Sequence, residues 1–75
     1  MEKRIKEIMG EILEIDVNDI DENTSPETTQ NWVSLRHMNL IVALEDEFKI
    51  TFREDEIIEL LSYKAILDSI KSKVA

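Results

Sequence analysis

Apolar side chains recur at intervals of three and four residues in three separate segments of this chain. The sets are Ile5, Ile8, Met9, Ile12 and Leu13; then Leu40, Ile41, Leu44 and Phe48; then Ile66, Leu67, Ile70 and Val74. Such spacing places each set on one face of an α-helix. The middle helix, expected over residues 34–48, contains neither glycine nor proline. We therefore predict an all-α fold, a small bundle of three main helices plus one short helix, formed by residues 1–75 as a single domain.

The segments between these helices carry weaker signals. Residues 49–53 are expected to form an extended connector that buries Ile50 and Phe52, and a short helix with acids in its first turn is expected to begin within residues 51–56. The apolar side of that short helix is assigned to Ile57, Ile58, Leu60 and Leu61. Ser62 is expected to cap the last helix. Gly10 weakens the first helix, which suggests that another element approaches closely there.

Residues 16–33 are predicted to form a long loop after the first helix. They hold Pro26 and mostly polar side chains, and we expect Val17, Ile20 and Trp32 to pin them to the core. Eighteen residues is long for a connection in a small domain, which hints at function. The run from Asp19 begins like a calcium-binding loop. It then lacks the glycine and glutamate that such a loop requires, so no metal site is expected.

Charge and composition exclude several classes of function. The chain has 17 acidic against 9 basic residues, a net charge of −8 at pH 7, and no cysteine. An acidic chain is repelled by nucleic acid and attracted to basic protein surfaces. The absence of cysteine excludes disulfides, zinc fingers and cysteine nucleophiles. No apolar run is long enough for a membrane span, and residues 1–6 do not resemble a signal peptide. We expect a cytoplasmic monomer without nucleic acid or membrane partners.

Ser34 stands where the loop ends and the second helix begins. It can cap the helix through its hydroxyl oxygen. Alternatively, it can carry a phosphate ester, because unpaired N–H groups and the positive end of the helix dipole lie at that position. His37, three residues later, lies next to Ser34 on a helix. No orienting acid or oxyanion site is indicated beside it, so we predict an exposed surface histidine rather than a catalytic one.

The second helix also bears a second apolar stripe of Leu35, Met38 and Val42, which leads toward Glu45 and Asp46. A helix on the surface of a bundle needs only one apolar stripe to face the core. The second stripe therefore either packs inside the domain or is available to a partner.

Taken together, these features resemble the acyl carrier protein family. The resemblance spans nearly the whole chain at the spacing of that family. It includes Ile5–Glu11 of the first helix, Trp32-Val33-Ser34-Leu35, Ala43–Phe48, the short helix after Phe52, and Ile66–Ile70. It implies a carrier and not an enzyme. A phosphopantetheinyl transferase would attach phosphopantetheine from coenzyme A to Ser34. The thiol of this cofactor would hold acyl or aminoacyl groups as thioesters during lipid or secondary metabolite biosynthesis.

The resemblance also assigns roles to other residues. It implies that Leu35, Met38 and Val42 face the enzymes that load and transfer the acyl group, and that Glu45 and Asp46 meet basic residues of those enzymes. Four further residues match positions that line the space between the helices, where an acyl chain can shelter: Leu44, Phe52, Leu60 and Ile66.

One departure from the family pattern concerns the motif itself. Val33 stands where the family has an aspartate that helps the transferase engage its substrate, so we predict poor or absent modification of Ser34. The alternative function is an unmodified, carrier-derived module that binds a basic partner through the second helix. Arg36 and His37 place positive charge in the first turn, against the helix dipole. We also expect the valine form to be at least as stable as a Val33→Asp variant, because it has less charge repulsion.

Overall fold

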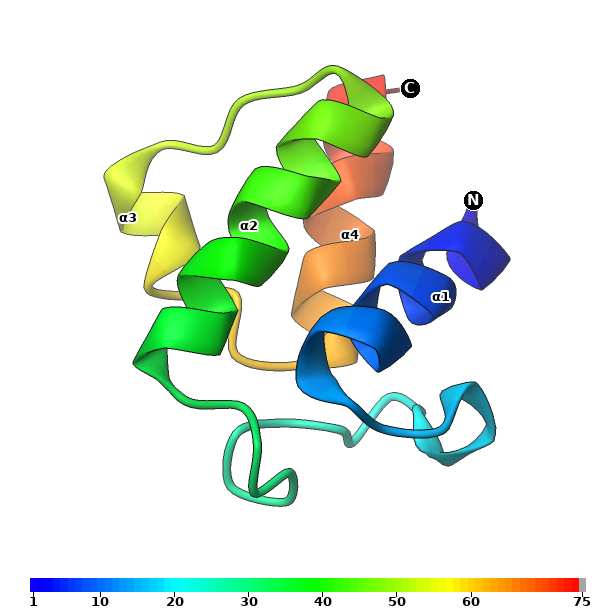
Figure 1. Ribbon diagram of the computed structural model, residues 1–75. Helices are drawn as coiled ribbons and strands as arrows, with labels where there is room; N and C mark the ends of the chain where they lie inside the picture. Colours follow the sequence, from blue (N-terminus) through cyan, green and yellow to red (C-terminus); the bar gives the residue numbers. More distant parts are fainter. Residues whose placement is uncertain (75) are drawn as a thin grey trace.

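The computed structural model describes residues 1–74 and contains four α-helices in this range. They are α1 (Glu2–Leu13), α2 (Ser34–Phe48), α3 (Glu54–Ile57) and α4 (Tyr63–Val74), and a 3₁₀ turn, η1 (Val17–Asp19), follows α1. Figure 1 shows α1, α2 and α4 as the body of the molecule, with the short α3 at the side of α2. The described residues contain no β-strand. This arrangement confirms the predicted bundle of three main helices and one short helix.

Two ion pairs between α1 and α2 show how the two helices are oriented. Near the start of α1, Arg4 lies 3.1 Å from Glu47, which is at the end of α2. Near the start of α2, Arg36 lies 2.8 Å from Glu14, directly after α1. The two helices therefore run antiparallel. Both pairs are partly exposed, so they contribute to the register of the helices more than to the stability of the fold.

The core is built from the apolar faces that the periodicity predicts. Its buried members are Ile5, Ile8, Met9, Leu13, Ile20, Trp32, Leu40, Ile41, Leu44, Phe52, Leu60, Tyr63, Ile66, Leu67 and Ile70. Phe48 packs against this cluster but is only half-buried. Val74 was expected on the buried face and is instead 41% exposed, because it is the last residue of α4 and lies outside the core cluster.

Gly10 allows the chain to fold back across the end of α1, as expected. A Cβ atom at this position would lie 2.9 Å from the carbonyl oxygen of Ile15 and 3.1 Å from Cγ1 of Val17. The reversal begins at Glu14, which has a left-handed backbone with φ of 57°. The Ile15 N–H then donates to the Gly10 carbonyl at 3.0 Å. The close approach explains why a glycine stands in this helix despite its low helix propensity.

The long loop is pinned to the core by two of the three expected side chains. Ile20 and Trp32 are buried, whereas Val17 is 40% exposed, so its predicted role as an anchor is wrong. Its Cγ1 atom packs close to Gly10, but this contact leaves much of the Val17 side chain exposed. A buried Thr24 adds an anchor that the sequence did not indicate. Its carbonyl accepts a hydrogen bond from the N–H of Tyr63, which joins the loop to the start of α4.

The segment from α2 to α4 differs in part from the prediction. Phe52 is buried as expected, but the short helix begins at Glu54, so residues 51–53 belong to the extended connector. Ile58 and Leu61 were assigned to the apolar side of this helix and are instead 71% and 52% exposed. The helix ends at Ile57, and the chain then turns these two side chains outward. The Ser62 hydroxyl accepts a hydrogen bond from the Ala65 N–H at 3.0 Å, which confirms the predicted cap of α4.

Candidate functional site

Ser34 is the first residue of α2, and the N-cap position before it is occupied by Val33. The Val33 backbone is extended, and its side chain makes no capping hydrogen bond. The interpretation of Ser34 as the N-cap is therefore wrong by one position. Because valine has no acceptor atom, the first N–H groups of α2 have no side-chain oxygen from the N-cap residue.

The Ser34 side chain is exposed and borders a small recess of about 170 Å³. The recess is lined by Pro26, Trp32, Val33, Ser34, His37 and Leu61. It therefore lies where the end of the long loop, the start of α2 and the segment after α3 meet. The hydroxyl is accessible to an enzyme that approaches this end of α2.

The second apolar stripe of α2 faces solvent. Leu35, Met38 and Val42 are 72%, 47% and 61% exposed. This decides between the two possibilities that the sequence left open, because none of the three side chains is buried inside the domain. The exposed Asp46 continues the same face one turn further along α2. An apolar stripe with an acidic end is thus present at the positions that the sequence indicated.

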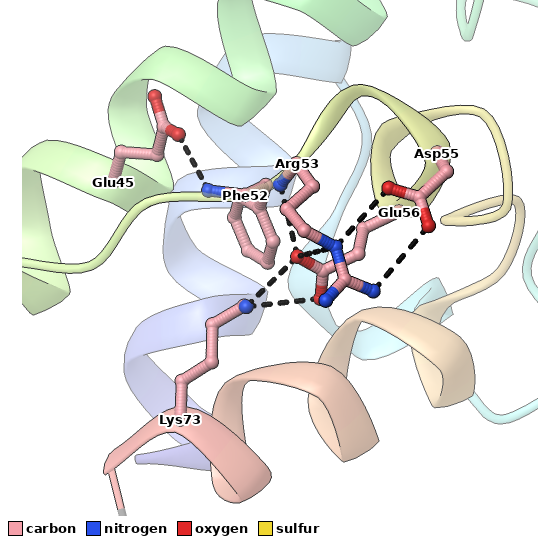
Figure 2. A network of polar contacts seen from close by, with 6 residues as sticks. All are labelled: Glu45, Phe52, Arg53, Asp55, Glu56 and Lys73. Atoms are coloured by element: carbon pink, nitrogen blue, oxygen red, sulfur yellow. Dashed lines mark hydrogen bonds and ion pairs between the residues drawn. The ribbon is translucent and has the colours of Figure 1, made fainter.

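Glu45 differs from Asp46 in its surroundings. It is half-buried, and its Oε2 atom accepts a hydrogen bond from the Phe52 N–H at 2.8 Å (Figure 2). One oxygen of this carboxylate thus ties the connector to α2. Any contact with a partner would have to use the other oxygen, whereas the Asp46 carboxylate is exposed.

His37 is half-buried, so the prediction of an exposed surface histidine is wrong. Its Nδ1 atom accepts a hydrogen bond from the Trp32 indole N–H at 2.9 Å, and its Nε2 atom lies 2.9 Å from the Ile57 carbonyl oxygen. Both ring nitrogens are therefore engaged, and neither is free to take a proton from Ser34. The sequence offered no signal for this role, because Trp32 precedes the helix and lies outside its periodicity.

Arg36 also has a structural role that sequence reasoning missed. Its guanidinium donates to the Ile12 carbonyl at 3.0 Å and pairs with Glu14 at 2.8 Å. It thereby satisfies a carbonyl near the C-terminal end of α1, where a positive charge is favourable. The positive charge of Arg36 is unfavourable at the N-terminus of α2, but its guanidinium lies at the C-terminal end of α1, where a positive charge is favourable.

A second polar network joins α3 to α4, as Figure 2 shows. The Glu56 carboxylate accepts the Arg53 N–H at 2.9 Å and pairs with Lys73 at 2.9 Å. The backbone hydrogen bond from Arg53, together with the hydrogen bond from Lys73, lowers the pKa of Glu56 below its ordinary value. Asp55 lies 3.1 Å from Arg53 on the outer side. This network fastens the connector and short helix without reaching Ser34.

Two aspartates of the long loop accept hydrogen bonds from nearby backbone N–H groups of the same loop. Asp16 accepts the Asn18 N–H at 2.9 Å and Asp21 accepts the Asn23 N–H at 2.8 Å, both through Oδ1. These are the local turns that aspartate favours. Across residues 1–74, no group of three or more histidine, cysteine, aspartate or glutamate side chains is arranged to hold a metal ion. None of the described helices is long and apolar enough to cross a membrane.

The four residues that the resemblance placed between the helices all lie in the core. Leu44, Phe52, Leu60 and Ile66 are at most 5% exposed and belong to one apolar cluster. No model of a known protein family matches this chain. Ideas about its function therefore rest on the residues of the site and on their geometry.

Proposed function

We propose that this protein is a freestanding acyl carrier that holds acyl or aminoacyl groups as thioesters on a phosphopantetheine arm attached to Ser34. The observation that supports this most directly is the position of Ser34. An exposed hydroxyl stands as the first residue of α2, at the head of an exposed apolar stripe of Leu35, Met38 and Val42. A carrier needs both features side by side, one for the arm and one for the enzymes that use it.

The attachment chemistry requires coenzyme A and a transferase. The Ser34 oxygen attacks the phosphorus next to the pantetheine in the pyrophosphate of coenzyme A. A phosphodiester bond to serine forms, the bond between that phosphorus and the bridging oxygen breaks, and adenosine 3′,5′-bisphosphate leaves with the electron pair. A base of the transferase takes the serine proton. The residues present suit the product, because its negative charge would lie beside first-turn N–H groups that lack a side-chain cap.

The partners would be the transferase and the enzymes that load and transfer the acyl group. Leu35, Met38 and Val42 would supply apolar contacts, and Asp46, together with the free oxygen of Glu45, would meet basic side chains. Complementary charge of this kind speeds association and makes it sensitive to salt. The protein itself would be the substrate of these enzymes in the cytoplasm, and not an enzyme.

An unmodified interaction module is the second candidate function, and Val33 favours it. Val33 occupies the N-cap position and is 54% exposed. It removes the carboxylate that the family motif has at this position and adds a fourth apolar side chain beside Leu35. Such a surface would bind a basic partner protein without any arm on Ser34.

Intact mass spectrometry after incubation with coenzyme A and a broad-specificity transferase tests the proposal. The chain, Val33→Asp and Val33→Asp with Ser34→Ala are compared. We expect the Val33→Asp variant to gain one phosphopantetheine rapidly, the unchanged chain to gain it slowly or not at all, and the double variant to gain none. Equal rates for the first two would show that Val33 does not hinder modification. If the Val33→Asp variant stays unmodified although it is folded, the interaction module becomes the better explanation.

A further inference from the structure

His37 connects three parts of the molecule that are separate in the sequence. It lies on α2, its Nδ1 atom accepts a hydrogen bond from Trp32 at the end of the long loop, and its Nε2 atom bonds the Ile57 carbonyl at the end of α3. The Trp32 and His37 rings also stack, with centroids 6.0 Å apart and planes at 30°. Two walls of the recess beside Ser34, Trp32 and Leu61, belong to the segments that His37 holds.

This arrangement is possible for only one protonation state of the imidazole. The indole N–H of Trp32 can donate but cannot accept, so Nδ1 of His37 must carry a lone pair. The Ile57 carbonyl can accept but cannot donate, so Nε2 must carry the hydrogen. A second proton would have to sit on Nδ1, where it would face the hydrogen of the Trp32 N–H. The neutral ring with hydrogen on Nε2 satisfies both partners, and the charged ring satisfies only Ile57.

We propose that His37 is a pH-sensitive clasp that holds Trp32 against α2 while the ring is neutral and releases it when the ring is protonated. Imidazole is the side chain whose charge ordinarily changes between about pH 5 and 8. Protonation leaves the bond to Ile57 intact and removes the bond to Trp32. The side chain that moves is therefore Trp32, which is only 3% exposed in the closed arrangement.

The stacking of the two rings does not compensate for the lost hydrogen bond. An attraction between a cation and an aromatic face requires the charge within about 6 Å of the ring centroid. The two centroids are already 6.0 Å apart, so the imidazolium would be at the outer limit of that range. The two N–H groups, by contrast, would face each other at the present 2.9 Å separation of their nitrogens. The repulsion between two donors acts at a much shorter distance and decides the outcome.

Carboxylates that could hold a charged ring in place are directed elsewhere. The Glu14 carboxylate is paired with Arg36, the residue before His37 on α2, and the Glu56 carboxylate of α3 is paired with Lys73. The residues that line the recess include no acid from α2, α3 or the loop, although Glu27 follows Pro26 and Glu59 follows Ile58 in the sequence, both exposed. Protonation therefore acts on the clasp through the two hydrogen bonds that His37 makes with Trp32 and Ile57. For the part that concerns Ser34, the inference rests on the proposed function: release of Trp32 would remove one wall of the recess beside the attachment serine.

The chain suits a direct test, because it has one tryptophan and one histidine. The wavelength of the Trp32 emission maximum is followed from pH 7.5 to 5.5, a range in which ordinary carboxylates stay ionised. We expect a red shift at the acid end as the indole becomes exposed to water. The wavelength is the readout because a charged ring can quench the intensity without moving the indole. His37→Asn is the matched control, since its amide oxygen can accept from Trp32 but does not titrate, and its emission maximum should not change with pH.

The tautomer of His37 gives a second readout on the unchanged chain, which holds even if the variant fails to fold. Long-range ¹H–¹⁵N spectra at pH 7.5 should show hydrogen on Nε2 and a bare Nδ1. An Nδ1–H tautomer, a ring that stays neutral down to pH 5.5, or a Trp32 emission maximum that stays constant while the spectra show the ring becoming protonated, would overturn the proposal. Modification of Ser34 is scored separately by mass, so a failed carrier function leaves the fluorescence and tautomer results interpretable by themselves.

Discussion

The two ends of α2 are finished in opposite ways. At the C-terminal end, Lys49 takes a left-handed backbone with φ of 56°, and the N–H groups of Lys49 and Ile50 both donate to the Glu45 carbonyl. The Glu45 side chain then accepts the Phe52 N–H, so the helix end and the connector are closed by one residue. Both the carbonyl and the carboxylate of Glu45 therefore have protein partners.

At the N-terminal end, the polar groups that hold the helix lie on its inner side only. Arg36 and His37 are tied to α1, the loop and α3, whereas Val33 and Ser34 are exposed and the N-cap position has no acceptor. Core packing and contacts on the inner side therefore suffice to hold this end. The outer side is left with an accessible hydroxyl and with backbone donors that suit an anion.

The largest difference is expected between two leucines of the same helix. Leu44 is fully buried near the C-terminal end of α2, and Leu35 is 72% exposed at its N-terminal end. Leu44→Ala should lower the free energy of unfolding by about 2–5 kcal/mol, because it leaves a cavity in the core. Leu35→Ala should change it by less than about 0.5 kcal/mol. Urea unfolding of both variants measures this, and a large loss from Leu35→Ala would show that the outer stripe is packed.

The polar closure of the C-terminal end is expected to have the next largest effect. Glu45→Ala leaves the Phe52 N–H without its charged acceptor and should lower stability by about 1–3 kcal/mol. Asp46→Ala, the adjacent exposed acid, is the control and should have little effect on unfolding. In a binding assay with a basic partner enzyme the order should reverse, with the larger loss from Asp46→Ala. Equal losses of stability would argue against a special role for the Glu45 contact.

A side-chain cap at the N-terminus of α2 should stabilise the fold. Val33 already has the extended backbone of an N-cap residue, and an aspartate there can accept an N–H of the first turn. Val33→Asp should raise the free energy of unfolding by about 0.5–2 kcal/mol. This reverses the expectation from charge repulsion alone, since a nearby hydrogen bond outweighs one more charge at long range. Thermal unfolding of the unchanged chain and of Val33→Asp distinguishes the two expectations. Val33→Asn is a neutral capping control that should reproduce most of the gain in stability.

The smallest effect on stability is expected from the polar network of Arg53, Glu56 and Lys73, and this effect depends on pH. The folded-state pKa of Glu56 is lowered by the Arg53 N–H and by Lys73, so its contribution to stability is present above the ordinary carboxylate range. It is lost as the pH falls through the folded-state pKa. Glu56→Gln keeps an acceptor for Arg53 but loses the charge. The variant should melt at a slightly lower temperature than the unchanged chain at pH 7, and the two should converge in acid.

Sequence reasoning succeeded where a local rule was sufficient. Helical periodicity predicted α1, α2 and α4 with their buried faces, Ser62 was identified as a cap, and Gly10 as a point of close approach. It predicted the bounds of α2 correctly but did not foresee the left-handed backbones of Glu14 and Lys49 that end α1 and α2, because a glycine normally signals such a turn. It also failed for His37, whose partners come from the loop and from α3.

The sequence was enough to predict the class of fold, a second apolar stripe on α2 as a candidate surface, and Ser34 as the residue at its head. Those properties follow from periodicity and from the chemistry of single residues. The tertiary structure alone decided that Glu45 holds the connector, that Arg36 serves the end of α1, and that His37 joins Trp32 to Ile57. The reason is physical. A long polar side chain takes whichever donor or acceptor the packed neighbours bring within about 3 Å, and which neighbours those are is set only when the helices pack.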